Sequence, residues 1–271
     1  MDKIWLKNYP AGVPHEVHPE QYRSAAHMIE DAMRQHAGRP FSVCMEQWMG
    51  YAELDRQSAA LGAWLQGQGL APGARVAIML PNIPQFAVTM AAVLRAGYIC
   101  VNVNPLYTGR ELEHQLKDSG SSAIVILENF AHTLAEVIEH TGVQRVVMAS
   151  MGDLPGFWYG RWITFAVRHL AKMVPAYDLP LSAGRTLVTF RQALSDGARR
   201  TLTASSATLD DTAFLQYTGG TTGLSKGAVL THRNIVAATL QAEAWFTPAL
   251  AKMGDVTKAN SIAALPLYHI F

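Results

Sequence analysis

Helical and strand-like segments alternate along this sequence from Tyr51 onward. The periodicity predicts helices at 51–66, 85–95, 108–119 and 130–140, with strands between them at 75–80, 98–103, 122–127 and 144–149. Strand–helix–strand units of this length need right-handed crossovers and give parallel strands. We therefore expect an α/β fold with a mostly parallel sheet flanked by helices.

The same alternation returns in the last third of the chain. Strand patterns predict strands at 212–217, 227–230 and 261–265, and a helix is expected to start after Thr231 as its N-cap and to end near Phe246. Thr108 and Glu111 have the Thr-x-x-Glu form of a capping box, which predicts the start of the helix that follows them.

The overall composition indicates a globular protein without a nucleic-acid partner. The 22 basic residues almost balance the 21 acidic ones, whereas nucleic-acid binding favours a basic excess. Cys44 and Cys100 lie in separate apolar stretches without metal-ligand spacing, so we expect two buried structural thiols. The first 17 residues lack a secretory signal, and the longest apolar stretch, 86–94, is too short to span a bilayer, which predicts a cytoplasmic protein.

Glycine, threonine and lysine are concentrated between Thr218 and Gly227. Glycines allow positive φ angles and bring several backbone N–H groups to one anion, while threonine hydroxyls and a lysine add donors and charge. This composition suits the phosphates of a nucleotide. The residues that we expect to bind them are Thr218, Gly219, Gly220, Thr221, Thr222, Gly223 and Lys226.

The order of residues distinguishes this loop from better-known phosphate loops. In a Walker A loop the lysine precedes a Ser or Thr and a helix follows, but here Lys226 follows Ser225 and precedes a strand pattern. The stretch also lacks the Gly-x-Gly-x-x-Gly of a dinucleotide fold. A GTPase, kinase or dinucleotide-binding interpretation is therefore excluded.

The stretch Tyr217–His232 resembles the signature loop of the adenylate-forming superfamily, and the whole chain resembles the bacterial long-chain fatty-acid–CoA ligases within it. Other stretches that carry the resemblance are Ile4–Pro10, Val101–Tyr107, Arg110–Leu116 and Leu265–Phe271. The second and third of these also fit a simple strand, turn and capped helix. The superfamily usually has proline where this chain has Ser225, which leaves the loop more flexible without removing its phosphate donors.

The resemblance implies that residues 1–271 form an incomplete N-terminal AMP-binding domain of such a ligase. The reaction uses ATP, Mg²⁺, a fatty acid and CoA, with Thr218 near the magnesium and with Tyr268 and His269 lining the acyl and adenylate site. His269 also fits an ordinary histidine at the end of a strand. The magnesium-binding acid, the ribose-binding aspartate and the C-terminal domain with its catalytic lysine would follow Phe271, so we expect no activity from these residues alone.

Residues 150–184 interrupt the alternation and form a basic, aromatic insertion. On a helix, Arg161, Arg168 and Lys172 fall on one narrow face, with Trp158 and Trp162 beside them. Such a helix is typical of one lying on an anionic membrane, which predicts a peripheral membrane contact. A surface helix docked on the domain core gives the same pattern, and both interpretations stay open.

Two further functions fit the sequence. One is a ligase of the same superfamily that acts on aryl or short acids. The other is a non-catalytic module that binds a nucleotide or a membrane without turnover.

Overall fold

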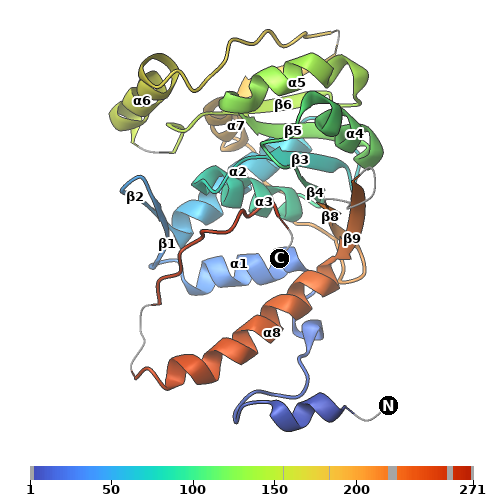
Figure 1. The fold of residues 1–271 in the computed structure, drawn as a ribbon, viewed down its shortest axis with the longest axis vertical. Coiled ribbons are helices and arrows are strands. Elements are labelled where there is room, and N and C mark those ends of the chain that lie inside the picture. The colour runs from blue at the N-terminus through green and yellow to red at the C-terminus, as the bar shows by residue number, and fades with distance from the viewer. Residues whose placement is uncertain (1–2, 155, 183, 219–224, 255–258, 270–271) are drawn as a thin grey trace.

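The computed structural model describes residues 3–154, 156–182, 184–218, 225–254 and 259–269, and its centre is a seven-stranded sheet (Figure 1). The strand order is β7-β6-β5-β3-β4-β8-β9, and all neighbours pair in parallel except β8 with β9. The expected mostly parallel sheet is confirmed. The strands are β3 (Arg75–Met79), β4 (Ile99–Asn102), β5 (Ser121–Leu127), β6 (Arg145–Ala149), β7 (Thr186–Thr189), β8 (Thr212–Thr218) and β9 (Lys226–Thr231).

Helices cover both faces of this sheet (Figure 1). On one face lie α4 (Gly109–Ser119) and α5 (Ala131–Val137), and on the other lie α2 (Tyr51–Gln66), α3 (Pro84–Arg95) and α7 (Phe190–Gly197). Two more helices, α1 (Ala25–Gln35) and α8 (His232–Ala251), pack outside the second layer. Short 3₁₀ helices are η1 (Ile4–Asn8), η2 (Pro19–Gln21), η3 (Glu128–Phe130) and η4 (Ile138–His140).

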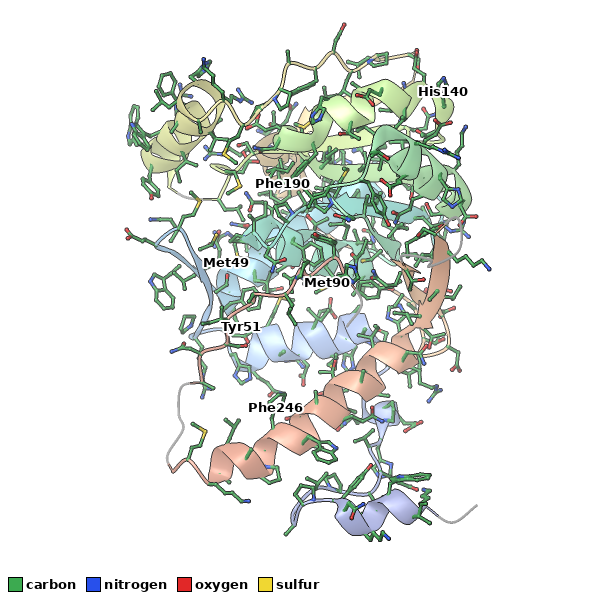
Figure 2. All side chains as sticks on the ribbon, in the orientation of Figure 1. Met49, Tyr51, Met90, His140, Phe190 and Phe246 are labelled. Carbon is green, nitrogen blue, oxygen red and sulfur yellow. The ribbon has the colours of Figure 1, made fainter. Side chains whose placement is uncertain are left out.

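The central strands are apolar on both faces because both faces are covered. In β3, Val76 and Ile78 pack toward α2 and α3, whereas Ala77 and Met79 pack toward α4 and α5. Phe190 at the start of α7 is fully buried in the core between the sheet and α2 and α3, and it is labelled in Figure 2. The sheet therefore has a fixed register, because a slip by one residue would exchange the side chains of the two layers.

The helix starts predicted from capping residues are confirmed. Thr108 and Glu111 form a reciprocal capping box at α4, and Gly120 ends that helix with a φ of 62°. Thr231 caps α8 through a similar box with Asn234. The predicted end of α8 near Phe246 is too early, because the helix continues through Pro248 to Ala251.

Some elements were not predicted: α1, α7, β7 and a hairpin of β1 (Pro40–Cys44) and β2 (Gln47–Gly50). The hairpin turn places Met45 and Glu46 at positive φ, where Asn-Gly would be the expected signal. The prediction of two buried thiols is half wrong. Cys100 is buried in β4, but Cys44 is only partly buried because it ends a strand of this two-stranded hairpin.

The predicted strand at 261–265 is wrong. The segment forms no sheet pairing in the described part of the chain, and Ile262 and Leu265 are exposed. The side chain of Asn82 holds this backbone instead: its Nδ2 donates to the carbonyls of Ala263 (2.7 Å) and Leu265 (2.8 Å), and its Oδ1 accepts from the N–H of Leu267 at 2.8 Å. Side-chain hydrogen bonds therefore replace a strand partner here.

Residues 150–184 contain the connection between the parallel strands β6 and β7. They include α6 (Phe157–Phe165) and a π-helical turn, η5 (Ala166–Leu170). The predicted single face with three cations is wrong, because the helix ends before Lys172, which has a φ of 52°. Arg168 turns toward the core, where its Nε donates to the buried carboxylate of Glu128 at 2.8 Å.

Within the described ranges, no helix is long and apolar enough to cross a membrane.

Asp153 anchors the start of this connection. Its carboxylate accepts from the Ser150 backbone N–H at 2.6 Å and from the Ser150 hydroxyl at 3.1 Å, and it lies 3.6 Å from Arg191. Burial raises the pKa of the Asp153 carboxyl to about 6, and these hydrogen bonds and the arginine act in the opposite direction. The neutral form is therefore favoured in the folded protein relative to the unfolded chain.

We predict that Asp153→Asn removes a pH dependence of stability. Because the folded pKa is raised above 3.8, the contribution of Asp153 is fully present below that pH and is lost as pH rises through about 6. The free energy of unfolding of the variant relative to the wild type should rise by roughly 3 kcal/mol between pH 3.8 and pH 7. Urea denaturation at several pH values measures it, and parallel profiles for the two proteins would contradict the assignment.

Candidate functional site

The predicted phosphate loop joins two antiparallel strands. Strand β8 ends at Thr218 and β9 begins at Lys226, and these two residues are the last cross-strand pair of the hairpin. Five of the predicted phosphate-binding residues lie outside the described residues: Gly219, Gly220, Thr221, Thr222 and Gly223. The structure nevertheless fixes both ends of the loop that contains them.

The parallel pairing of β8 with β4 places this hairpin at one edge of the sheet. Cys100 pairs with Phe214 and Asn102 pairs with Gln216, so Thr218 lies beyond the C-terminal end of β4. Ligands of open α/β sheets bind outside the carboxyl ends of the strands. Thr218 and Lys226 therefore lie at the edge of the sheet where ligands of such folds bind.

A chain of buried amide side chains lies beneath this edge. Gln115 donates to the carbonyl of Asn102 at 2.7 Å, the Asn102 amide donates to Gln216 Oε1 at 2.9 Å, and Gln216 Nε2 donates to the carbonyl of Tyr268 at 2.9 Å. All three amide residues are buried. The structure thus brings Tyr268 and His269, predicted from the far end of the sequence, next to β8 and β4.

Both ends of the loop also contact α4. The Tyr217 hydroxyl donates to Asp118 Oδ2 at 2.5 Å, and His114 Nε2 lies 3.0 Å from the carbonyl oxygen of Ser225. Burial and, second, the hydrogen bond to Asp118 raise the pKa of the Tyr217 phenol, so Tyr217 is a neutral donor. These contacts fix the residue before Thr218 and the residue before Lys226.

Gly227 is needed where Tyr217 crosses the hairpin. The two residues are cross-strand partners, and a Cβ atom on Gly227 would lie 2.9 Å from Cε2 of the Tyr217 ring. The ring therefore occupies the space that a side chain would take. This close approach lets the Tyr217 hydroxyl reach α4.

His232 has a structural role. It is buried, and its Nδ1 accepts from the backbone N–H of Ala25 at 3.2 Å, which joins the start of α8 to the start of α1. Burial lowers the pKa of the His232 imidazole, which agrees with a neutral ring whose Nδ1 is an acceptor.

In the described ranges, no group of three or more His, Cys, Asp or Glu side chains could hold a metal ion.

A sequence profile described as "AMP-binding enzyme" matches residues 29–271. The chain belongs to the AMP-binding enzyme family. It is 47% identical to a long-chain-fatty-acid–CoA ligase of Escherichia coli O157:H7 and 31% identical to one of Bacillus subtilis. The alignments cover 100% and 99% of this chain but 47% and 46% of those proteins, so the chain spans about half the length of these relatives.

Solved structures of AMP-binding enzymes share the fold. A long-chain-fatty-acid-CoA ligase from Archaeoglobus fulgidus aligns with a TM-score of 0.66 and 23% identity, over 96% of this chain and 45% of that protein. An anthranilate CoA ligase in complex with anthranoyl-AMP aligns with a TM-score of 0.62 and 16% identity, over 89% and 39%. At these identities the likeness is one of fold.

Sequence reasoning missed Asn82, His114, Asp118 and Gln216, which support this site of the AMP-binding fold. A usable signal was present for the first one. Asn82 comes just after the predicted strand 75–80, at the carboxyl end of a strand, where ligands of open α/β sheets bind. The two α4 residues carried no such signal, since their partners are more than 90 residues away in the sequence.

We predict that Asn82→Ala releases the segment 263–269. Three hydrogen bonds are lost, each worth about 0.5–1.5 kcal/mol, and at an exposed site the lower values apply. Chymotryptic cleavage after Leu267 and Tyr268 should become about tenfold faster, because cleavage requires local opening. Asn129→Ala is the matched control, since Asn129 makes an amide-to-carbonyl bond with Met173 elsewhere. Equal cleavage rates in both variants would refute the anchoring role.

Proposed function

We propose that this chain forms the phosphate-binding half of an ATP-dependent long-chain fatty-acid–CoA ligase. One observation carries the proposal. Thr218 and Lys226 face each other across a hairpin at the carboxyl edge of the parallel sheet, in a chain 47% identical over its whole length to such a ligase. A hydroxyl and an ammonium group at a sheet edge suit the oxygens of a nucleotide phosphate.

The reaction proceeds in two steps. A carboxylate oxygen of the fatty acid bonds to the α-phosphorus of ATP while the bond to pyrophosphate breaks, which gives acyl-AMP. The sulfur of CoA then bonds to the acyl carbon, the thiol proton is released, and AMP leaves. The first step depends on positioning and on neutralising phosphate charge.

In this scheme Thr218, Lys226 and residues 219–223 hold the pyrophosphate oxygens. Tyr268 and His269 line the acyl and adenylate side, where Gln216 fixes the Tyr268 backbone. Mg²⁺, when bound, supplies further neutralisation of the phosphates, and the hydroxyl oxygen of Thr218 is a hard donor that fits this ion. CoA is the second substrate.

The fold is shared with an anthranilate CoA ligase, so the fold alone does not indicate the acid substrate. The long-chain substrate is proposed from the relatives with 47% and 31% identity. We assign residues 1–271 to the N-terminal part of the AMP-binding domain, with 150–184 as an insertion within it. On this basis the chain should bind ATP without completing the reaction.

We predict that the 271-residue chain binds Mg-ATP in calorimetry but makes no acyl-CoA from ATP, fatty acid and CoA. Lys226→Met should weaken ATP binding by about tenfold or more, since a charged hydrogen bond to phosphate is worth about 1.5–3 kcal/mol. Lys7→Met is the control, because Lys7 lies on the N-terminal turn η1, away from the hairpin (Figure 1). Pyrophosphate release that depends on fatty acid would show that the chain is active alone. Equal effects of the two substitutions on ATP binding would contradict the phosphate site at Lys226.

We also propose that α6 and η5 contact the anionic inner leaflet of a membrane. Large apolar side chains are exposed along this segment, and Arg161 and Lys172 are exposed beside them. No acidic residue occurs between Asp153 and Asp178, so the surface complements anionic lipid. The exposed apolar side chains are Trp158, Tyr159, Trp162, Phe165, Leu170 and Met173.

Not all side chains of α6 and η5 are available for a membrane contact. Arg168 pairs with Glu128, whose side chain is only 1% exposed, and Ile163 is buried. One part of α6 and η5 thus docks on the core, and the aromatic part is left to contact lipid.

We predict that Trp158→Ala with Trp162→Ala reduces sedimentation of the protein with vesicles of anionic phospholipid by about tenfold or more. Two buried tryptophans contribute several kcal/mol to interfacial binding before ordering costs are subtracted. Trp5→Ala is the matched control, because Trp5 is also exposed but lies on η1. Vesicles of phosphatidylcholine alone should retain less wild-type protein. Unchanged sedimentation of the double variant would contradict the membrane contact. Self-association of the wild type without lipid, lost in the double variant, would assign the surface to a second copy of the chain.

A further inference from the structure

One side of α4 carries two polar residues that both reach the β8–β9 hairpin. His114 and Asp118 are four residues apart, which places them on the same face of the helix, one turn from each other. His114 contacts the carbonyl of Ser225 and Asp118 contacts the hydroxyl of Tyr217. A single helix therefore holds the strand that enters the predicted phosphate loop and the strand that leaves it.

Helix α4 is itself firmly placed. Leu112 and Leu116 are fully buried against β3 and β5. Gln115 on the same helix is buried and donates to the backbone of β4. The two side chains of the contact face thus project from a rigid support.

The hairpin needs such support because β9 is an edge strand of the described sheet. It pairs with β8 alone, and Val229 in its middle is 60% exposed. Hairpin ends that lack a neighbour on one side open more easily than strands in a sheet interior. A ligand that binds there must then bear the cost of ordering the backbone.

The contact of His114 has a defined direction. A carbonyl oxygen can only accept, so the Nε2 atom of His114 carries the proton and donates to Ser225. The peptide group of Ser225 immediately precedes Lys226, so this bond sets the direction in which β9 begins. On the opposite strand the Tyr217 hydroxyl donates to Asp118, which fixes the residue directly before Thr218.

We propose that His114 is a positioning residue for nucleotide phosphates, and that together with Asp118 it clamps both ends of the phosphate loop. This inference rests on the function proposed above. His114 acts through the backbone at Ser225, so its loss removes no proposed phosphate donor but releases the peptide group that precedes Lys226.

The first test is the affinity of the 271-residue chain for Mg-ATP in calorimetry. His114→Ala should weaken binding about fivefold to tenfold, as expected for one hydrogen bond that orders the site. His114→Gln should restore the affinity to within about twofold, because its amide can donate at a similar reach. Tyr217→Phe, which removes only a hydroxyl, should weaken binding in the same range. It tests the clamp even if the alanine variant misfolds.

Thr108→Ala separates this role from a general effect on α4. It removes the helix cap and should lower the melting temperature by about 2–4 °C. It should leave the ATP affinity within about twofold of the wild type. If Thr108→Ala and His114→Ala weaken binding equally, His114 is merely structural and the proposal is wrong.

A second readout needs no nucleotide. Amide hydrogen exchange at Ser225 and Lys226 should become about fivefold to tenfold faster in His114→Ala and stay unchanged in Thr108→Ala. Absence of ATP binding by the wild type would overturn the proposed phosphate site, whereas the exchange rates would still decide whether the clamp exists. Unchanged exchange in His114→Ala would overturn the clamp whether or not ATP binds.

Discussion

The parallel pairing of β4 with β8 is the constraint on which the candidate site depends. It joins two segments more than 100 residues apart in the sequence and sets Asn102 opposite Gln216. Their side-chain hydrogen bond continues to the backbone of Tyr268, so three distant parts of the chain meet at one edge of the sheet. A shift of β8 by one residue would turn Gln216 to the other face and separate the hairpin from α4.

Much of this arrangement could be predicted from periodicity and capping residues. Strands with two apolar faces and helices with clear caps, such as the capping box of Thr108, lie within a few residues of their expected positions. The failures have two causes, which are dependence on distant partners and turn residues that are atypical for their conformation. The stretch 261–265 has strand-like composition but is held by Asn82, and the turn of the first hairpin uses Met45 and Glu46 at positive φ. Propensity alone indicates neither the distant contact nor the unusual turn.

The segment 150–184 shows the limit of placing residues on an ideal helix. The helical wheel grouped Arg161, Arg168 and Lys172, but the π-helical turn and the end of the helix separate them. Arg168 is directed by Glu128, a buried acid that follows β5 and needs a cation close by. The ion pair with Glu128 thus separates Arg168 from the exposed Arg161 and Lys172, and large apolar side chains of α6 and η5 are exposed as well.

Ser225 is the position at which the predicted phosphate loop departs from the usual superfamily pattern. The superfamily usually has proline there, which fixes φ within the chain itself. The Ser225 hydroxyl is buried and has no hydrogen-bond partner among the described residues, so it does not replace that restraint. Its carbonyl is held by His114 instead. The order that a proline builds into a loop is here supplied from outside it, by a neighbouring helix whose own position is set by the packing of β3 and β5.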